Sequence, residues 1–260
     1  MSAEAHHDEY DDRMIAMLEL IWGEGYMTPG GPEYVRETIG SHDLKGLTVL
    51  DIGCGIGGQD VVLAREYGAR VVGLDIEAPV LERARRLVAK HGLQDRVDFK
   101  LTVPGPLPFP DASFDAVYSS GAFTQIADKA GMFREVFRVL KPGGWFLNYD
   151  WMKSPGPYSD DMQYFFEVEG LTYAMETIER HGEILRDVGF TAIELVDSWD
   201  QYRRLAKREY EQMKGPMFPT MVEMLGPEKA AHFVENWRAM VVVLEKGEHR
   251  PGRYRARKPV

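Results

Sequence analysis

The sequence predicts an α/β fold: a Rossmann-like, mostly parallel sheet of seven strands with helices on both faces. Three observations support this prediction. Strand-like and helix-like segments alternate from residue 47 to residue 150, a glycine-rich turn follows the first strand, and an acidic residue ends the second. Strands that alternate with helices pair in parallel, because each helix carries the chain back to the same edge of the sheet. A chain of 260 residues is long enough for one such domain.

The glycine-rich turn is the segment on which the interpretation depends. Residues 47–52 form a short apolar strand, the next residues include four glycines, and a helical pattern covers 59–67. Glycine lets the backbone turn sharply and lets a ligand approach without a Cβ in the way. A second strand over 70–74 leads to Asp75, about 20 residues after the turn, where a carboxylate suits the two hydroxyls of a ribose.

The spacing of the glycines fits two classes of cofactor. Gly53, Gly55 and Gly58 satisfy the dinucleotide pattern G-x-G-x-x-G, whereas Asp51 with Gly53, Gly55 and Gly57 satisfies D-x-G-x-G-x-G, the pattern of S-adenosylmethionine (SAM) sites. Asp51 favours SAM, because a carboxylate near the turn suits an ammonium and a sulfonium better than a pyrophosphate. A nicotinamide-dependent dehydrogenase stays open as the alternative from another class.

The alternation continues through the rest of the core. The predicted elements are a helix over 77–91, a strand over 96–103, a proline-rich loop over 104–110, a strand over 114–119, a helix over 129–140 closed by residues 141–144, and a strand over 145–150. Ligands of parallel sheets bind beyond the carboxyl ends of the strands. We therefore expect one crevice bordered by Gly53, Asp75, Val103, residues 119–125 and Asp150.

Segments of different composition flank this core. Helices are predicted over 10–21 and 32–39, with a glycine-rich loop between them. After an aromatic and methionine-rich stretch over 152–175 come a helix over 176–188, a strand over 191–196, two or three helices over 198–246 broken at Pro216 and Pro219, and a final edge strand over 252–258. Most of these aromatic and methionine side chains should pack helices together, and a few should line a substrate cavity. The predicted division of the single domain (1–260) is a lid (1–40), a cofactor-binding core (41–150), a substrate cap (151–250) containing the sixth strand, and the last strand (251–260).

Charge and composition favour a small-molecule partner. The formal net charge of -10 disfavours nucleic acid and anionic membrane surfaces as partners. The N-terminal residues do not read as a signal peptide and no apolar run reaches the length of a membrane span, so a cytoplasmic location is expected. The oligomeric state is not indicated by the sequence.

The metal-binding and general-base residue types give no pattern of their own. Cys54 is the only cysteine and is predicted to be a small packed residue, and the scattered histidines lack the spacing of zinc ligands. His91, His181, His232 and His249 are predicted to lie on helices or exposed turns, in surface roles. No metal site and no histidine base are therefore expected.

Four sequence features together resemble the class I SAM-dependent methyltransferases. They are the D-x-G-x-G-x-G run of residues 51–57, Asp75, residues 107–115 (Leu-Pro-Phe-Pro-Asp-Ala-Ser-Phe-Asp) and residues 140–144 (Leu-Lys-Pro-Gly-Gly). The opening segment, Tyr10 with residues 21–31, is similar to that of the phosphoethanolamine N-methyltransferases. The resemblance implies SAM as the cofactor, an N-terminal lid that folds over it, and a helical substrate cap before the last strand.

The same resemblance, with the strand ends, assigns the site residues. The expected cofactor contacts are Tyr10, Met27, Thr28, Asp51, Gly53, Gly55, Gly57, Gln59, Asp75, Ile76, Val103, Pro104 and Ser119. Tyr26, Asp150 and Tyr173 are expected on the acceptor side. Tyr10 and Gln125 are the polar groups expected beside the transferred methyl, as candidate catalytic residues.

The chain also departs from the family pattern. Gly121 and Gln125 stand in register with an acid and a histidine that assist methyl transfer in the family, and Leu171 falls near a phosphate-binding arginine. Val103 replaces the acid that usually meets the adenine amino group, which backbone groups can also bind. These departures predict that SAM binding is retained and that phosphoethanolamine is not the acceptor.

The predicted function is SAM-dependent methylation of a small molecule, with an amine-bearing metabolite as the favoured acceptor. Aromatic faces stabilise a cation and methionine adapts to irregular apolar shapes, so an amine that becomes a more substituted ammonium would use both. Two alternatives stay open: C-, O- or S-methylation of an apolar, prenyl-like or natural-product acceptor, and a non-catalytic SAM-binding protein.

Overall fold

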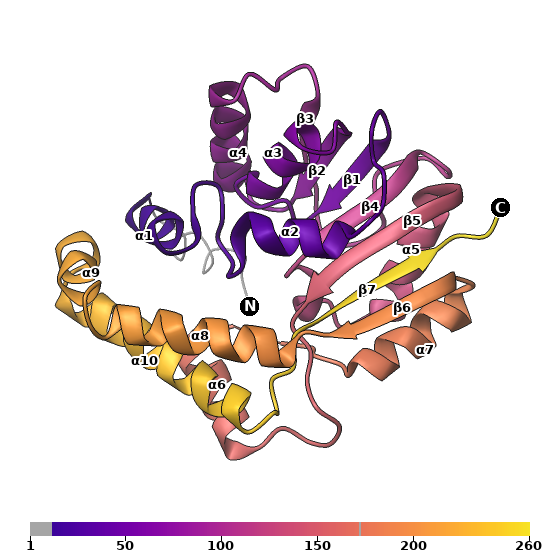
Figure 1. The fold of residues 1–260 in the computed structure, drawn as a ribbon. Helices are drawn as coiled ribbons and strands as arrows, with labels where there is room; N and C mark the ends of the chain where they lie inside the picture. Colours follow the sequence, from indigo (N-terminus) through magenta and orange to yellow (C-terminus); the bar gives the residue numbers. More distant parts are fainter. Residues whose placement is uncertain (1–11, 172) are drawn as a thin grey trace.

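The computed structural model describes residues 12–171 and 173–260. Its strands are β1 (Thr48–Ile52), β2 (Arg70–Asp75), β3 (Val97–Leu101), β4 (Phe114–Ser120), β5 (Leu140–Asp150), β6 (Thr191–Asp197) and β7 (Gly252–Arg257). They form one sheet in the order β3-β2-β1-β4-β5-β7-β6 (Figure 1). The pairs from β3 to β5 are parallel, whereas β7 runs antiparallel to β5 and β6. The predicted Rossmann-like fold is confirmed.

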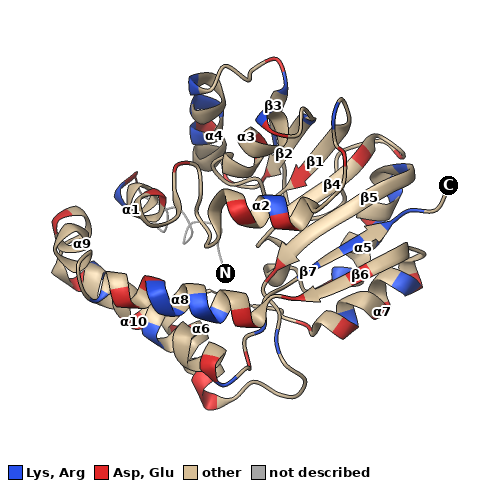
Figure 2. Ribbon diagram, in the orientation of Figure 1, with Lys and Arg blue, Asp and Glu red and all other residues tan. Residues whose placement is uncertain are grey.

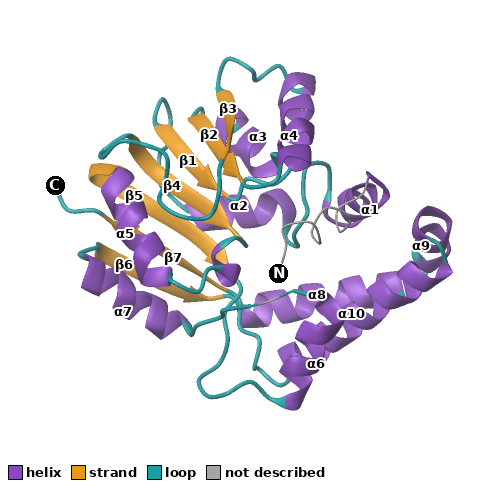
Figure 3. Cartoon of the chain, turned by 180° about the vertical axis from the view of Figure 1, so that it is seen from behind, coloured by secondary structure: helices purple, strands orange, loops and turns teal. Residues whose placement is uncertain are grey.

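Helices cover both faces of this sheet, as Figure 3 shows from behind. One face carries α2 (Gly31–Ile39), α3 (Gly58–Arg65) and α4 (Ala78–Lys90), and the other carries α5 (Lys129–Val139) and α7 (Ile178–Val188). The two faces bury separate apolar clusters: Val35, Leu63 and Val88 belong to the first, and Phe133, Phe146 and Leu185 to the second. The helices thereby fix the sheet edge at which the site is built.

A second group of helices stands beyond the carboxyl ends of the strands. It comprises α6 (Asp160–Glu169), α8 (Trp199–Met213), α9 (Phe218–Leu225) and α10 (Pro227–Glu245), while α1 (Asp12–Trp22) lies between this group and α4 (Figure 1). Buried aromatic and methionine side chains such as Phe165, Tyr202, Met213, Trp237 and Met240 form their common core. Most of the late aromatic residues therefore pack helices together, as predicted.

Some predicted elements differ from the structure. β5 begins at Leu140 rather than at Trp145, because residues 141–144 continue the strand past a bulge and the backbone N–H of Gly143 bonds the carbonyl of Lys258. β7 is an interior strand, not the predicted edge strand, because it is inserted between β5 and β6. Helix α6 was not predicted, and Pro219 lies in the first turn of α9 instead of breaking a helix.

The prediction for two histidines is wrong. His181 and His249 are both fully buried rather than exposed, and burial lowers the pKa of His181 to about 4 and that of His249 to about 3. His181 bonds the carbonyl of Thr177 and His249 packs edge-on against Trp151, so both are neutral core residues. Cys54 is buried, in agreement with its predicted packing role.

Acidic and basic side chains alternate along the outer helices. In Figure 2, basic and acidic segments follow each other along α7 and α8, where the pairs Arg180–Glu183 and Arg203–Asp200 are 2.8 and 2.9 Å apart.

Within residues 12–171 and 173–260, no helix combines the length and the apolar character that a membrane span requires.

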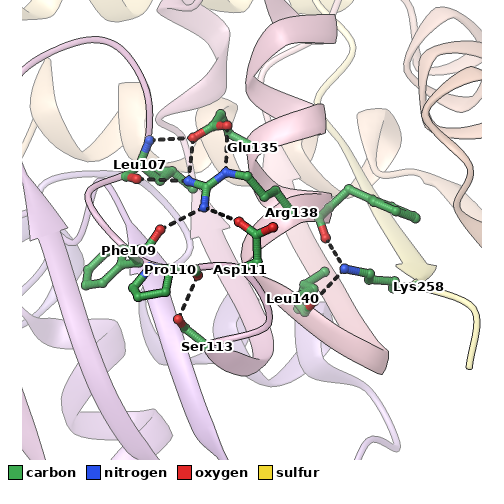
Figure 4. Close-up of polar contacts among 10 residues, drawn as sticks. Leu107, Phe109, Pro110, Asp111, Ser113, Glu135, Arg138, Leu140 and Lys258 are labelled. Carbon is green, nitrogen blue, oxygen red and sulfur yellow. Dashed lines mark hydrogen bonds and ion pairs between the residues drawn. The ribbon is translucent and has the colours of Figure 1, made fainter.

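Arg138 of α5 holds the proline-rich loop between β3 and β4 against this helix (Figure 4). Its guanidinium donates to the carbonyl oxygens of Leu107 and Phe109, at 3.0 and 2.7 Å. It also donates to the carboxylate of Glu135 and to that of Asp111. Glu135 in turn accepts the backbone N–H of Leu107 at 2.7 Å. The arginine hydrogen bond is the main cause that lowers the pKa of Glu135. The guanidinium of Arg138 thus fixes the loop that follows β3.

We predict that Arg138→Met lowers the free energy of unfolding by about 2 kcal/mol, because several charge-assisted hydrogen bonds to half-buried acceptors are lost together. Chemical denaturation followed by circular dichroism measures this change. Arg134→Met, at an exposed position of the same helix, is the matched control. Equal stability of the two variants would show that Arg138 does not hold the loop.

Candidate cofactor and acceptor site

The glycine turn between β1 and α3 is closed on one side and open on the other. Gly53, Gly55 and Gly57 have φ angles of +73°, +55° and +89°, which favour glycine. A Cβ on Gly53 would lie 2.4 Å from the Cβ of Ala122, so no larger residue fits there. A Cβ on Gly55 would meet no atom closer than Sδ of Met27, at 4.0 Å. The turn therefore packs tightly against Ala122 at Gly53 and leaves open space beside Gly55.

Asp75 is fixed beside this turn at the end of β2. Its carboxylate accepts the backbone N–H groups of Gly55, Ile76 and Glu77 at 2.9, 2.7 and 3.1 Å. Burial raises the pKa of Asp75, and these N–H donors oppose the shift. An acid held at this point, next to the open side of the turn, fits the ribose hydroxyls of SAM. Gln59 supports the turn from inside, because its amide donates to the carbonyl of Cys54 at 3.0 Å.

Two carboxyl groups, Asp51 and Asp60, are fully buried beneath the turn. Burial raises the pKa of Asp60 to about 8, and burial followed by the charge of Asp60 raises the pKa of Asp51 well above its usual range. The hydroxyls of Tyr26 and Tyr118 are buried near them, and both acids add to the raised pKa of each tyrosine. Because like charges this close are costly in a dry site, the pair retains a proton at neutral pH.

A cavity of about 390 Å³ opens next to the turn, between α1, the N-terminal loop, the turn after β4 and α10. Four of the predicted site residues line it: Met27, Thr28, Gln125 and Tyr173. The structure adds wall residues that the sequence analysis did not assign to the site: Trp22, Thr124, Trp151, Glu169, Phe233, Asn236 and Trp237. Only the aromatic members had a signal in the sequence, and it was their residue type alone.

The walls of the cavity combine aromatic rings with a few polar groups. Trp22 and Trp237 have ring centroids 5.4 Å apart, Trp237 stacks on Phe233 at 5.3 Å, and Trp151 lies 5.7 Å from Tyr173. Glu169 contributes a carboxylate at the end of α6. Such a cavity suits a small organic cation or amine, because aromatic faces and a carboxylate both stabilise positive charge.

The turn that presents Thr124 and Gln125 to the cavity is held from behind. This 3₁₀ turn, η1 (Phe123–Gln125), follows β4, and the buried ammonium of Lys129 donates to the carbonyl oxygens of Phe123 and Ile126, both at 2.9 Å. Asp150 accepts the backbone N–H of Trp151 at 2.8 Å, and burial raises its pKa to about 7. Asp150 thus lies behind the cavity wall rather than among the lining residues, where it was predicted.

Other predicted residues are distributed around the site rather than in the cavity. The hydroxyl of Ser119 donates to the carbonyl of Ile52 at 2.7 Å and so joins β4 to β1. Ile76 and Val103 are 53% and 75% exposed at the ends of β2 and β3, where a cofactor could cover them, and Pro104 follows. Tyr10 lies outside the described residues. Their roles toward the cofactor stay predictions.

Comparison with known proteins agrees with this geometry. Residues 50–148 match the family model described as a methyltransferase domain. The chain is 32% identical to phosphoethanolamine N-methyltransferase 1 of Zea mays, over 96% of its own length and 49% of that protein. It is 31% identical to phosphoethanolamine N-methyltransferase 3 of Arabidopsis thaliana, over 96% of its own length and 50% of that protein. The chain thus spans about half the length of these curated relatives.

Solved structures show the same similarity. Phosphoethanolamine N-methyltransferase 2 of Haemonchus contortus, bound to phosphomonomethylethanolamine and S-adenosylhomocysteine, superposes with a TM-score of 0.88 at 26% identity, over 98% of this chain and 59% of that one. A protein from Galdieria sulphuraria, described as a candidate sarcosine dimethylglycine methyltransferase, shares the fold with a TM-score of 0.82 at 21% identity. The match covers 96% of this chain and 98% of that one. The chain belongs to the class I SAM-dependent methyltransferases, and SAM is its cofactor.

We predict that Asp75→Ala lowers the affinity for SAM by at least about tenfold, because hydrogen bonds to a charged group contribute about 1.5–3 kcal/mol each. Isothermal titration calorimetry measures the affinity. Asp95→Ala, exposed after α4, serves as the control, and circular dichroism checks that the turn still folds without its three N–H contacts. Unchanged SAM binding by a folded Asp75→Ala variant would contradict the assigned cofactor position.

We predict that Asp60→Asn flattens the fall in stability between about pH 4 and pH 8. The folded state binds a proton that the unfolded state releases above its ordinary pKa, so the wild-type free energy of unfolding falls by up to about 1.4 kcal/mol per pH unit in this window. The amide needs no proton and removes the part of this slope that Asp60 contributes, while buried Asp51 keeps its own part. Urea denaturation at several pH values measures it, and parallel pH profiles of wild type and variant would refute the shared proton.

Proposed function

We propose that this methyltransferase N-methylates a small amine-bearing metabolite that carries no phosphate. The observation that carries the proposal is the carboxylate of Glu169 among the aromatic rings that line the cavity next to the SAM site. An ammonium in this position would be stabilised by the carboxylate and by the surrounding ring faces.

The chain's own residues would bind, orient and desolvate the acceptor. SAM, when bound, supplies an electrophilic methyl group, so the transfer needs an aligned nitrogen lone pair and exclusion of water more than a strong base. The nitrogen–carbon bond forms as the carbon–sulfur bond breaks, and S-adenosylhomocysteine leaves. A protonated amine must first lose its proton, and Glu169 is the carboxylate of the cavity that can accept it. Thr124 and Gln125 provide polar atoms at the end of β4.

Phosphoethanolamine is the second candidate acceptor, because the curated relatives are named for it. Among the described residues, the cavity is lined by no arginine, and Leu171 forms part of its wall. The basic side chains that line this cavity are Lys229 and His232, both at exposed positions of α10. A phosphate dianion binds best to bidentate arginine contacts in a desolvated site, so these residues favour the phosphate-free amine.

A methyl-transfer assay tests this proposal. We expect release of S-adenosylhomocysteine with dimethylethanolamine at a kcat/KM at least about tenfold above that with phosphoethanolamine, because the cavity offers ring faces and one carboxylate to a cation but no forked donor to a phosphate. A prenyl alcohol in the same panel represents the apolar alternative. Preference for phosphoethanolamine, or methylation of the prenyl alcohol alone, would overturn the assignment.

We predict further that Glu169→Gln raises the KM for the amine by at least about tenfold with little change in SAM affinity, because the cation of the acceptor loses a charge partner. Glu167→Gln, exposed on the same helix, is the matched control. Steady-state kinetics with calorimetry of SAM binding separate the two effects. A loss of SAM affinity equal to the loss of amine affinity would place Glu169 outside the acceptor site.

A further inference from the structure

Glu209 of α8 joins the N-terminal helix to the helical cap. One carboxylate oxygen accepts the indole N–H of Trp22 at 3.1 Å, and the other accepts the indole N–H of Trp237 at 3.2 Å. Trp22 is the last residue of α1 and Trp237 belongs to α10, so three segments that are distant in sequence meet at one side chain. Burial raises the pKa of Glu209 to about 7, while the two indole donors oppose this shift.

The two indoles that Glu209 joins also form part of the acceptor cavity. Phe233, Trp237 and Trp22 make a row of three rings, with centroids 5.3 and 5.4 Å apart along it. The first two rings come from α10, whereas the third comes from the N-terminal helix. The row, and with it this wall of the cavity, is complete only when α1 lies against the cap.

An earlier turn of α1 reaches the cofactor site. Ile15 packs with Ile56 of the glycine turn and Val80 of α4, and Met27 packs against the same cluster. The loop after Trp22 continues over the turn, where the N–H of Gly58 bonds the carbonyl of Gly25 at 3.0 Å. Helix α1 is therefore held at two places: by apolar contacts over the cofactor site and by the Glu209 bridge at the cap (Figure 1).

We propose that Glu209 is the positioning residue that keeps the N-terminal helix closed over both the cofactor and the acceptor cavity. An indole N–H is a donor only and a carboxylate an acceptor only, so two oxygens serve two indoles without a competing arrangement. Opening of α1 requires the Trp22 bond to break and leaves a half-buried carboxylate short of a donor. This proposal rests on the proposed function in one respect, because it assumes that the acceptor binds in this cavity. Retention of the cofactor does not depend on the acceptor's identity.

The test measures release of S-adenosylhomocysteine, which needs no acceptor. Glu209→Gln keeps the shape of the side chain but turns an NH₂ group toward one indole N–H. We expect the dissociation rate of tritiated S-adenosylhomocysteine, chased by unlabelled compound, to rise at least about fivefold, as expected when closure loses a charge-assisted contact. Trp22→Phe should raise it similarly, and the double variant no further, because both changes act on the same bridge between α1 and the cap.

Glu211→Gln, on the same helix at an exposed position, is the matched control and should leave the rate within about twofold of wild type. Trp22→Phe keeps the test decisive if Glu209→Gln does not fold, since it removes one donor and leaves the carboxylate in place. A purely structural role would lower the melting temperature without changing the dissociation rate, and would overturn the proposal. Additive rates in the double variant would overturn it as well. Failure of every amine to be methylated would contradict only the proposed function.

Discussion

The carbonyl of Leu74 is the point at which the cofactor site is fixed to the sheet. It accepts the backbone N–H groups of both Gly53 and Cys54, at 2.8 and 3.1 Å, and so binds the glycine turn to the end of the neighbouring strand. Asp75 follows directly and accepts the N–H of Gly55. Because β1 pairs in parallel with both β2 and β4, the turn, the acid and the segment after β4 meet at one edge. The acceptor cavity is built outward from this edge.

Behind this edge, the protein maintains polar groups in a nearly dry interior. Lys129 binds carbonyl groups of the turn after β4, and Asp150 accepts backbone N–H groups of Phe123 and Thr124 in the same turn. Asp51 and Asp60 lie beneath the glycine turn. Burial of such groups is costly unless they are bonded or neutral, which accounts for the raised pKa values of the acids and the lowered pKa of Lys129. These side chains position the site without touching the acceptor cavity.

The acceptor side differs in construction, because it draws its walls from distant parts of the chain. Trp22 arrives from the N-terminal helix, Glu169 from α6 and Trp237 from α10. Relatives that share the cofactor half can therefore differ in acceptor by exchanging a few cap residues. The shared fold accounts for the high structural similarity to enzymes named for phosphoethanolamine. Under the proposed function, the residues that line the cavity would decide which acceptor is bound.

The sequence by itself determined the cofactor half. Glycines that need a positive φ, an acid at the end of the second strand and the alternation of strands and helices are local features, and local geometry transfers directly from sequence to structure. It also indicated Met27, Thr28, Gln125 and Tyr173, which do line the cavity. Only the tertiary structure decided that β7 lies inside the sheet, that His181 and His249 are buried, and that Glu209 joins two indoles. Those outcomes depend on contacts between residues far apart in the chain, and no spacing along one segment encodes them.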